Sequence, residues 1–279
     1  MAVDILNFEF MQNAIAAGLL TSIICGIMGT LVVVNRIVFL SGGIAHAAYG
    51  GIGMAFYFKW PVMISTMGFS LAASMLMAGI TLKARHRADT IIGVIWALGM
   101  ALGIILMDLT PGYNVDLMSY LFGSILTVPR SDLLIMLVMG AGIAAVVALF
   151  YKDLLAVSYD EEFAQVRGIP VKRIYFCLIA MLGLTIVMVI QVVGLIMVIA
   201  LLTIPPFMVE KYARSLGQMM IFSSLLGMGF TLCGLWLSYA FNLTSGASII
   251  LVAGLCFLVS LVVDKLWATA KKSSRTKTR

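Results

Sequence analysis

One ionisable ring stands inside a long apolar stretch of this sequence. His46 lies in the run Ser41-Gly42-Gly43-Ile44-Ala45-His46-Ala47-Ala48-Tyr49-Gly50-Gly51, and no Asp or Glu occurs between Glu9 and Asp89. An ionisable group at membrane depth is costly unless it faces protein, water or an ion, and such groups mark transport pathways. The pathway interpretation of this run takes in His46, Ser41, Gly42 and Tyr49. A histidine bonded to a carbonyl of a neighbouring helix, with a structural role only, is the alternative.

The composition is that of a membrane protein that crosses the bilayer several times. Of the 279 residues, 62% are hydrophobic and 11% are charged, and the mean hydropathy is +1.11. Soluble domains carry about a quarter charged residues. We therefore expect one transmembrane domain over residues 1–264, surrounded by lipid, and a basic tail over residues 265–279. A net charge of +6 could suggest a nucleic-acid partner, but the placement of the basic residues along the chain explains it better. We therefore expect no nucleic-acid partner.

Apolar segments long enough to cross a bilayer recur along the chain, which predicts an all-α bundle. A span needs roughly 20 apolar residues. Nine segments are expected to span, although the Gly-rich second one leaves eight or ten open: Met11–Val34, Phe39–Phe58, Val62–Leu82, Thr90–Met107, Leu133–Phe150, Ile174–Ile190, Val192–Val209, Met219–Phe241 and Ala247–Val263.

The stretch Ile174–Val209 must break, because it carries no charge and as one helix would run about 54 Å at 1.5 Å per residue. That length far exceeds a hydrocarbon core of about 30 Å. Gln191 and Gly194 mark the expected break.

The basic residues predict the orientation, because cytoplasmic loops are enriched in Lys and Arg. With nine spans and the N-terminus outside, all Lys and Arg except Lys59 and Arg130 fall on the inner side. We therefore expect a multi-pass protein of the cytoplasmic membrane with its C-terminus in the cytoplasm.

The predicted inner loop Asp153–Arg173 is long enough to hold a docking element for a cytoplasmic partner. Ser158 is expected to cap a short helix through Arg167 that ends at Gly168 and Pro170. Acidic residues in its first turn and a basic residue in its last suit the helix dipole. The docking interpretation rests on Asp160, Glu161, Glu162, Phe163, Arg167 and Gly168, with Phe163 as an exposed anchor; a solvated loop helix is the alternative.

Two further segments carry local predictions. Within the outer loop Asp108–Asp132, the apolar piece Met118–Leu126 predicts a short helix in the membrane interface. Asp89, followed by Thr90 at the start of a span, is expected to be an N-cap, with a salt link to the docking segment as the alternative.

Catalytic motifs are missing from the sequence. No G-x-x-x-x-G-K-[ST] loop occurs, so the chain cannot hold a nucleotide phosphate in the usual way. Ser41 and His46 lack the G-x-S-x-G context of a hydrolase. The four cysteines stand apart in apolar segments, which indicates small buried side chains rather than a metal site. We expect a transport subunit, not an enzyme, without a permanently bound cofactor.

Several of these segments together resemble the membrane permease subunits of bacterial ABC importers for zinc, manganese and iron. The resemblance covers nearly the whole chain, in order. It rests on Ser41–Gly51, on Arg87-Ala-Asp89-Thr90-Ile-Ile-Gly93, on Leu121-Phe-Gly-Ser-Ile-Leu126, on Asp160–Gly168, on Gln191-Val-Val-Gly194 with Ala200-Leu-Leu-Thr-Ile-Pro205, and on Ser238-Tyr239 to Gly246.

The resemblance implies a permease of the vitamin B12-importer type (type II) that carries a divalent metal ion and pairs with a second copy of itself. Two copies of a cytoplasmic ATPase subunit would bind below it, and an extracytoplasmic metal-binding protein would deliver the ion above. The segment around Glu161–Gly168 would transmit the motion of the ATPase.

One departure from the family pattern concerns the metal site. Family members often carry an Asp four residues before the second-helix His, on the same helix face, whereas this chain has Gly42. His46 is then the remaining metal-binding candidate. In a dimer of the permease, the two copies of His46 would be related by the dimer axis and could both contact the ion. A permease for a metal chelate, siderophore or cobalamin-like cargo, and an ATP-independent carrier, stay open as alternatives.

Overall fold

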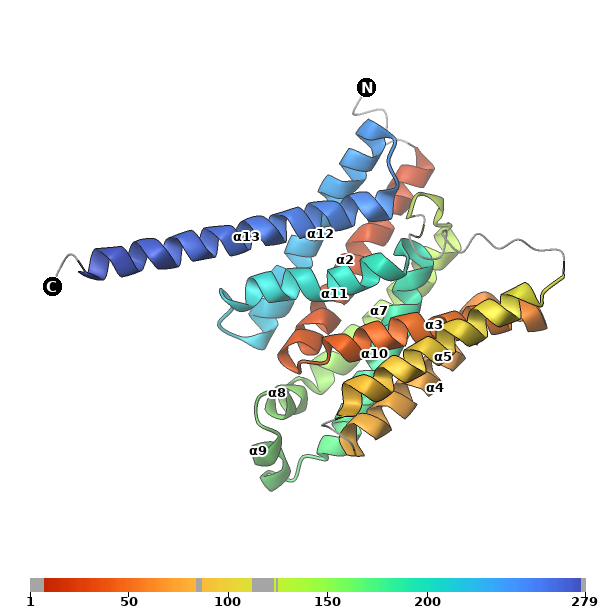
Figure 1. Cartoon of the computed structure of the whole chain (residues 1–279), viewed down its shortest axis with the longest axis horizontal. Helices are drawn as coiled ribbons and strands as arrows, with labels where there is room; N and C mark the ends of the chain where they lie inside the picture. The colour runs from red at the N-terminus through yellow and green to blue at the C-terminus, as the bar shows by residue number, and fades with distance from the viewer. Residues whose placement is uncertain (1–7, 84–86, 112–122, 124, 277–279) are drawn as a thin grey trace.

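The computed structural model describes residues 8–83, 87–111, 123 and 125–276, with backbone only at 192 and 267–276, and this part of the chain is helical with no strand. Figure 1 shows the arrangement of its elements, which are α2 (Glu9–Val34), α3 (Val38–Phe58), α4 (Val62–Lys83), α5 (Ala88–Asp108), η2 (Ile125–Thr127), α7 (Arg130–Leu149), α8 (Tyr151–Tyr159), α9 (Glu161–Val166), α10 (Val171–Val193), α11 (Leu195–Glu210), α12 (Leu216–Phe241) and α13 (Ser245–Thr276).

Eight of the described helices are long and apolar enough to cross a membrane, and these are α2 to α5, α7, α10, α12 and α13. The ninth predicted span corresponds to α11, which has 16 residues and would be about 24 Å long. The predicted break is confirmed at Gly194, which ends α10 and precedes α11. Gly194 has φ of 80° and ψ of 164°, a backbone conformation open mainly to glycine. Gln191, by contrast, continues α10.

The long helices run between two ends of the bundle, which we name by their landmarks. At the Gly123 end, Glu9 forms an ion pair with Arg130 at 2.9 Å, and Asn13 Nδ2 donates to Val128 O at 3.2 Å. Gly123 packs on the backbone of Val193 and Gly194 there. At the α9 end there is a cavity. It is bordered by α8 and α9, by the last turn of α2 and by the first turns of α5, α10 and α12.

Two groups of helices pack on each other inside the bundle. Helix α3 packs mainly on α5 and α4, whereas α2 packs mainly on α12 and α11, and α10 contacts both groups. Figure 1 shows α3, α4 and α5 side by side. A tight turn joins the groups between α2 and α3, where Arg36 has φ of 57° and Ile37 N donates to Val32 O at 3.0 Å.

Small and hydroxylated residues hold these helices together, as expected in lipid, where close backbone approach and interhelical hydrogen bonds replace the hydrophobic effect. Ser22 Oγ and Thr231 Oγ1 lie 3.0 Å apart between α2 and α12, and Ser224 Oγ donates to Ile23 O at 3.2 Å. Gly99 and Gly103 of α5 face the backbone of α3 at Ala47 and Tyr49. This Gly-x-x-x-Gly pair therefore allows α3 and α5 to pack closely.

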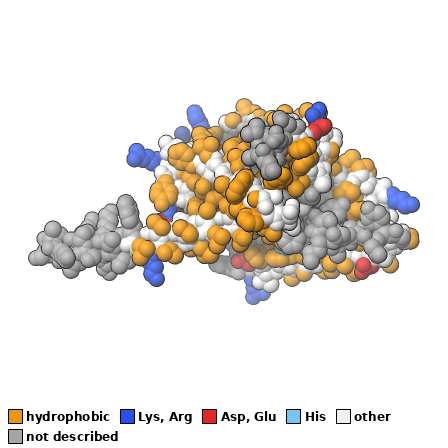
Figure 2. Space-filling model, turned by 90° about the horizontal axis from the view of Figure 1, so that it is seen from above, with side chains coloured by type: hydrophobic (Ala, Val, Ile, Leu, Met, Phe, Trp, Pro, Cys, Tyr) orange, Lys and Arg blue, Asp and Glu red, His pale blue; other side chains and the backbone are white. Residues whose placement is uncertain are grey.

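The outer surface suits a lipid environment. Figure 2 shows one face on which hydrophobic side chains predominate and charged side chains lie mainly at the margins. Helix α13 has 32 residues, about 48 Å, and in Figure 1 it extends past the other helices. The predicted tail therefore does not begin at a break in the backbone, because α13 continues unbroken from Ser245 through residue 265 to Thr276.

One local prediction from the sequence is wrong, and another lies mostly outside the described residues. Asp89 is not an N-cap: α5 begins at Ala88 with Arg87 at the cap position, so Asp89 lies in the first turn. Its carboxylate still stands where the helix dipole favours negative charge. The predicted interfacial helix Met118–Leu126 falls mostly outside the described residues. Its last two residues, Ile125 and Leu126, are described and belong to the short helix η2.

Candidate transport pathway and coupling site

His46 lies on α3 against an aromatic side chain of α5. Its imidazole stacks on the indole of Trp96, with ring centroids 4.2 Å apart and 8° between the ring planes. The imidazole is partly buried, and its Nδ1 is buried without a hydrogen-bond partner among the described residues. At this nitrogen the described residues supply no carbonyl partner.

The other three predicted pathway residues take different positions on α3. Gly42 lies one turn before His46 on the same helix face and is also partly buried. Ser41 is 1% exposed and Tyr49 is 2% exposed, and Ser41 Oγ donates to Val38 O at 2.7 Å. The structure therefore brings Gly42 and His46 together on one face, whereas Ser41 and Tyr49 are packed inside the chain.

There is open space around Gly42. A Cβ built at this position would have one neighbour within 4 Å, Ile199 Cδ1 of α11, at 4.0 Å. A side chain could therefore project from position 42 beside His46 without displacing the backbone. Within the described part of the chain, no group of three or more His, Cys, Asp and Glu side chains could hold a metal ion. A complete ligand set for a metal is therefore not built from the described residues of one chain.

The predicted docking segment forms a projecting helical corner at the α9 end. Asp160, not Ser158, caps α9, and its Oδ1 accepts a hydrogen bond from Phe163 N at 2.9 Å. Ser158 instead belongs to the preceding helix α8. Because Asp160 has extended backbone angles that suit an N-cap, the helix starts two residues later than the sequence pattern suggests. Gly168, with φ of 79°, follows the end of α9 as expected.

The exposed side of α9 combines acidic and apolar groups. Phe163 is 53% exposed and Val166 is 88% exposed, while Ala164 is buried against the protein. The Arg167 guanidinium lies 5.6 Å from the centre of the Phe163 ring. The remaining exposed members of the predicted docking set are Asp160, Glu162 and Gly168, whereas Glu161 is partly buried.

Two hydrogen bonds tie this corner to the transmembrane helices. Asn35 Nδ2, at the end of α2, donates to Ser158 Oγ at 2.9 Å and also to Leu31 O at 2.8 Å. Tyr151 Oη, at the start of α8, accepts from Gly217 N of α12 at 2.9 Å. A displacement of α8 and α9 would therefore act directly on α2 and α12, the two helices that pack closely together.

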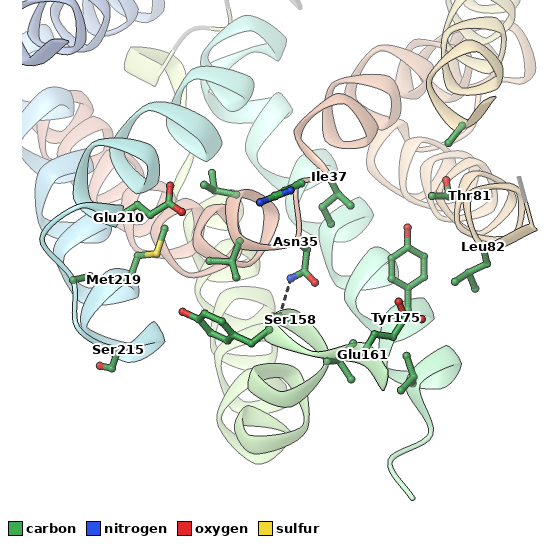
Figure 3. Close-up of a pocket in the computed structure, with 18 of the residues that line it drawn as sticks. Asn35, Ile37, Thr81, Leu82, Ser158, Glu161, Tyr175, Glu210, Ser215 and Met219 are labelled. Carbon is green, nitrogen blue, oxygen red and sulfur yellow. Dashed lines mark hydrogen bonds between the residues drawn. The ribbon is translucent and has the colours of Figure 1, made fainter. Parts of the chain in front are cut away.

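A vestibule of about 760 Å³ opens at the α9 end between the helix ends. Figure 3 shows Asn35 and Ser158 joined by their hydrogen bond, with Glu210, Met219 and Ser215 on one side of them and Thr81, Leu82, Tyr175 and Glu161 on the other. Arg36, Arg214 and Asp89 also line it. The vestibule is thus a polar chamber bordered by the docking corner and by both groups of helices.

Asp89 shares this vestibule with Glu161 of the docking segment. The ion pairs described are Glu9–Arg130 and Lys211–Asp264, neither of which involves Asp89. In the described part of the chain, the predicted salt link from Asp89 to the docking segment is therefore not formed.

Three functional candidates escaped the sequence reasoning. Trp96 occurs in a span that looks uniformly apolar, and Asn35 and Tyr151 stand at helix ends without a motif around them. A signal existed only for Asn35, an amide between the apolar α2 and the basic Arg36. The partners of Trp96 and Tyr151 lie 50 and 66 residues away, so only the fold reveals them.

Comparison with known proteins agrees with the resemblance seen in the sequence. Residues 7–264 match the ABC 3 transport family. The chain is 53% identical to an uncharacterized membrane protein of Synechocystis sp. over 93% of this chain and 92% of that protein. It is 33% identical to ScaB, a manganese import system permease protein of Streptococcus gordonii, over 92% of each chain.

A solved structure shares the arrangement of the helices. PsaBC from Streptococcus pneumoniae, solved in complex with Fab, is similar with a TM-score of 0.83 and 33% sequence identity, over 92% of this chain and 93% of that one. The expected type II ABC permease fold is thereby confirmed, as is the expectation of a transport subunit rather than an enzyme. By its sequence over residues 7–264 and by its fold, this chain belongs to the ABC 3 transport family.

Proposed function

We propose that this chain is the permease subunit of an ATP-driven importer that carries a divalent transition-metal ion across the cytoplasmic membrane. The observation that carries the proposal is the family match over residues 7–264. Manganese is the favoured cargo because ScaB, 33% identical to this chain, is named as a manganese import permease. Zinc and iron ions share the affinity for imidazole and are the further candidates.

The ion passes His46 on its way through the bundle. Supporting this role is a partly buried imidazole on α3 whose Nδ1 has no hydrogen-bond partner among the described residues. Gly42 keeps the face beside it open. Since one imidazole is a poor site for a divalent ion, a second copy of the chain would bring a second His46 to the pathway. Water and backbone carbonyls would complete a transient coordination shell.

The α9 end faces the cytoplasm in this proposal. Lys83, Arg87, Lys152 and Arg167 stand at that end, in agreement with the excess of basic residues in cytoplasmic loops. Nine helices running between the ends, α11 included, would then leave the N-terminus outside and the C-terminus inside. The Gly123 end would receive the ion from an extracytoplasmic metal-binding protein.

Two copies of a separate ATPase subunit would dock on the α8–α9 corner and supply the energy. The exposed Phe163 and Val166 offer apolar contact, and the acidic residues at positions 160–162 offer charge to a basic surface. Motion of the corner would reach α2 through Asn35–Ser158 and α12 through Tyr151–Gly217. The vestibule between those helices would then widen or narrow, and the ion would leave through it.

Transport by the reconstituted complex tests this function. The permease, its ATPase subunit and its binding protein are placed in vesicles and supplied in turn with Mn²⁺, Zn²⁺, Fe²⁺ and a metal chelate. We expect ATP-dependent uptake of the free ion, with Mn²⁺ taken up fastest. Concentrative uptake by the permease alone, or uptake of the chelate only, would contradict the proposal.

A further inference from the structure

Trp96 occupies a position on α5 that the packing of α3 on α5 determines closely. One turn after Trp96, Gly99 lies against Ala47 of α3, where an added Cβ would come within 2.8 Å of Ala47 Cα. A second turn on, Gly103 lies against the Tyr49 backbone just as closely, and Gly53 of α3 lies against Gly103. Because side chains larger than hydrogen do not fit there, the two backbones have one favourable register. That register brings residue 96 opposite residue 46.

The two rings are stacked with nearly parallel planes. A centroid distance of 4.2 Å with an interplanar angle of 8° covers one face of the imidazole with the indole. Aromatic pairs of this kind are stabilised by about 0.5–1.5 kcal/mol beyond the burial of their surface. The stack therefore restrains the rotation of the imidazole about its side-chain bonds.

The indole is itself held in place by two neighbours. Trp96 Nε1 donates to Met100 Sδ, one turn later on α5, at 3.0 Å. On α3, the Phe39 ring lies 6.2 Å from the Trp96 ring at an angle of 52°. Phe39 and His46 are two turns apart on α3, so the indole bridges two positions of one helix face.

Stacking restrains the imidazole without blocking metal binding, because a metal ion binds a ring nitrogen in the plane of the ring. Histidines that bind metals usually donate their other ring N–H to a carboxylate or carbonyl, which fixes the ring orientation. At Nδ1 of His46 no such bond is present among the described residues. The orientation of the ring must then come from another contact, and the stack with Trp96 supplies it.

We propose that Trp96 is a positioning residue for His46, holding the imidazole in the orientation that meets the passing ion. This inference rests on the proposed function, since it assigns Trp96 to the same pathway. Its chemistry is that of a neutral aromatic support, so Phe at position 96 should replace Trp in part, whereas an aliphatic side chain should not.

Uptake kinetics of the reconstituted permease–ATPase complex test the inference, with MnCl₂ as the probe. We expect Trp96→Leu to raise the half-saturating Mn²⁺ concentration about fivefold, the size of effect that loss of one aromatic stack produces. Trp96→Phe should stay within about twofold of the wild type, because the stack persists. Trp236→Leu on α12, where the indole is 65% exposed, is the matched control and should change nothing.

A double-mutant cycle separates positioning from general packing. If Trp96 acts through His46, then His46→Ala combined with Trp96→Leu should transport no worse than His46→Ala alone. Additive losses would indicate a structural role and would overturn the inference. If the wild type transports Mn²⁺ and Trp96→Leu transports it with the same kinetics, the inference is overturned but the proposed function stands. If the wild-type complex transports none of the ions, the proposed function is overturned as well.

A spectroscopic measurement keeps the test independent of whether Trp96→Leu folds. In a variant with Trp60, Trp236 and Trp267 replaced by Phe, Trp96 is the sole tryptophan. Mn²⁺ is paramagnetic and quenches a fluorophore a few ångströms away, so we expect MnCl₂ to reduce the emission of Trp96. The same variant carrying His46→Ala should lose this response. An Mn²⁺-independent emission in a transport-competent protein would overturn the inference.

Discussion

His46 combines two features that are rarely left together in an apolar helix: a partly buried imidazole and an unpaired ring nitrogen. Leaving a buried polar group without a hydrogen bond costs about 1–3 kcal/mol. Among the described residues, no protein group offsets this cost at Nδ1. A buried polar atom left at this cost calls for an explanation, such as a functional role of the side chain, and it makes His46 the first residue to test.

Replacing His46 with Ala should reduce uptake at low metal concentration by about tenfold or more, equivalent to ~1.4 kcal/mol added to the rate-limiting barrier. Uptake of the chosen ion across a range of concentrations measures this effect, and co-purification with the ATPase subunit checks that assembly is intact. His86, the other histidine of the chain, supplies the control His86→Ala. Equal uptake by the wild type and His46→Ala at every concentration would remove His46 from the pathway.

Gly42 offers a complementary gain-of-function test. The space at this position accepts a side chain, with Ile199 Cδ1 at 4.0 Å as the nearest neighbour of an added Cβ. Gly42→Asp would add a carboxylate one turn before His46, and oxygen with nitrogen ligands suits Mn²⁺ and Zn²⁺ better than one imidazole does. We expect tighter metal binding by the purified permease, about tenfold in dissociation constant.

Isothermal titration of the permease with Mn²⁺ measures the effect of Gly42→Asp. Gly68→Asp is a suitable control because Gly68 of α4 also has open space around its Cα and lies away from His46 in the sequence. An affinity unchanged by Gly42→Asp, or raised equally by Gly68→Asp, would contradict a pathway face made by positions 42 and 46.

Residue types predicted the pathway face only in part. A lone histidine among small residues was visible in the sequence, and the structure does bring Gly42 and His46 onto one face. The burial of Ser41 and Tyr49 was not visible, because nearness in sequence says little about which side of a helix faces its neighbours. Trp96 was missed for the same physical reason, since the register between α3 and α5 is a property of the folded pair.

At the scale of elements, the α3–α5 interface depends on glycine where the backbones touch. Gly103→Ala should lower the melting temperature of the purified permease, because a Cβ there overlaps Tyr49 O and forces the helices apart at a cost of about 1–3 kcal/mol. Gly93→Ala on the same helix is a matched control, since nothing lies within 4 Å of an added Cβ. Its helix propensity alone should favour folding by about 0.5–1 kcal/mol. Equal melting temperatures for the two variants would argue against a tight interface.

The α8–α9 corner should fail as a docking element when its charge is reversed. Glu161→Lys with Glu162→Lys is expected to weaken co-purification of the ATPase subunit and to reduce ATP-dependent uptake by about tenfold, because charge complementarity across the interface is lost. Lys59→Glu, an exposed charge at the end of α3 away from α9, is the control for co-purification. Full uptake and normal co-purification of the double variant would refute docking at α9.

Helix boundaries show where sequence reasoning reached its limit. The break at Gly194 was predictable, since a charge-free run too long for the bilayer contained the polar Gln191 and, three residues later, Gly194. The α9 cap shifted from Ser158 to Asp160, because both residues can cap and Ser158 is instead engaged by Asn35 of α2. The competing partner is distant in sequence, so local pattern alone could not choose between them.

At the scale of the whole molecule, the bundle is asymmetric in both charge and support. The α9 end gathers the docking corner, the vestibule and most of the described basic side chains, whereas the Gly123 end is held by the ion pair Glu9–Arg130 and by backbone packing around Gly194. An importer requires this asymmetry, since cargo enters at one end and the power-supplying partner acts at the other. Orientation in the membrane is therefore the property on which the proposed direction of transport depends.

Cysteine labelling from one side of the membrane tests that orientation. In a variant with Cys25, Cys177, Cys233 and Cys256 replaced, a single cysteine at Lys59 should react with an impermeant maleimide added to intact cells, because Lys59 ends α3 away from α9. A single cysteine at Gln165, exposed on α9, should react only after the membrane is opened. Since both positions are solvent-facing helix ends in a folded protein, a difference between them reports sidedness rather than burial. The reverse pattern would place the docking corner outside the cell, where no ATP is available to an ATPase subunit, and the chain could not then work as an importer driven from α9.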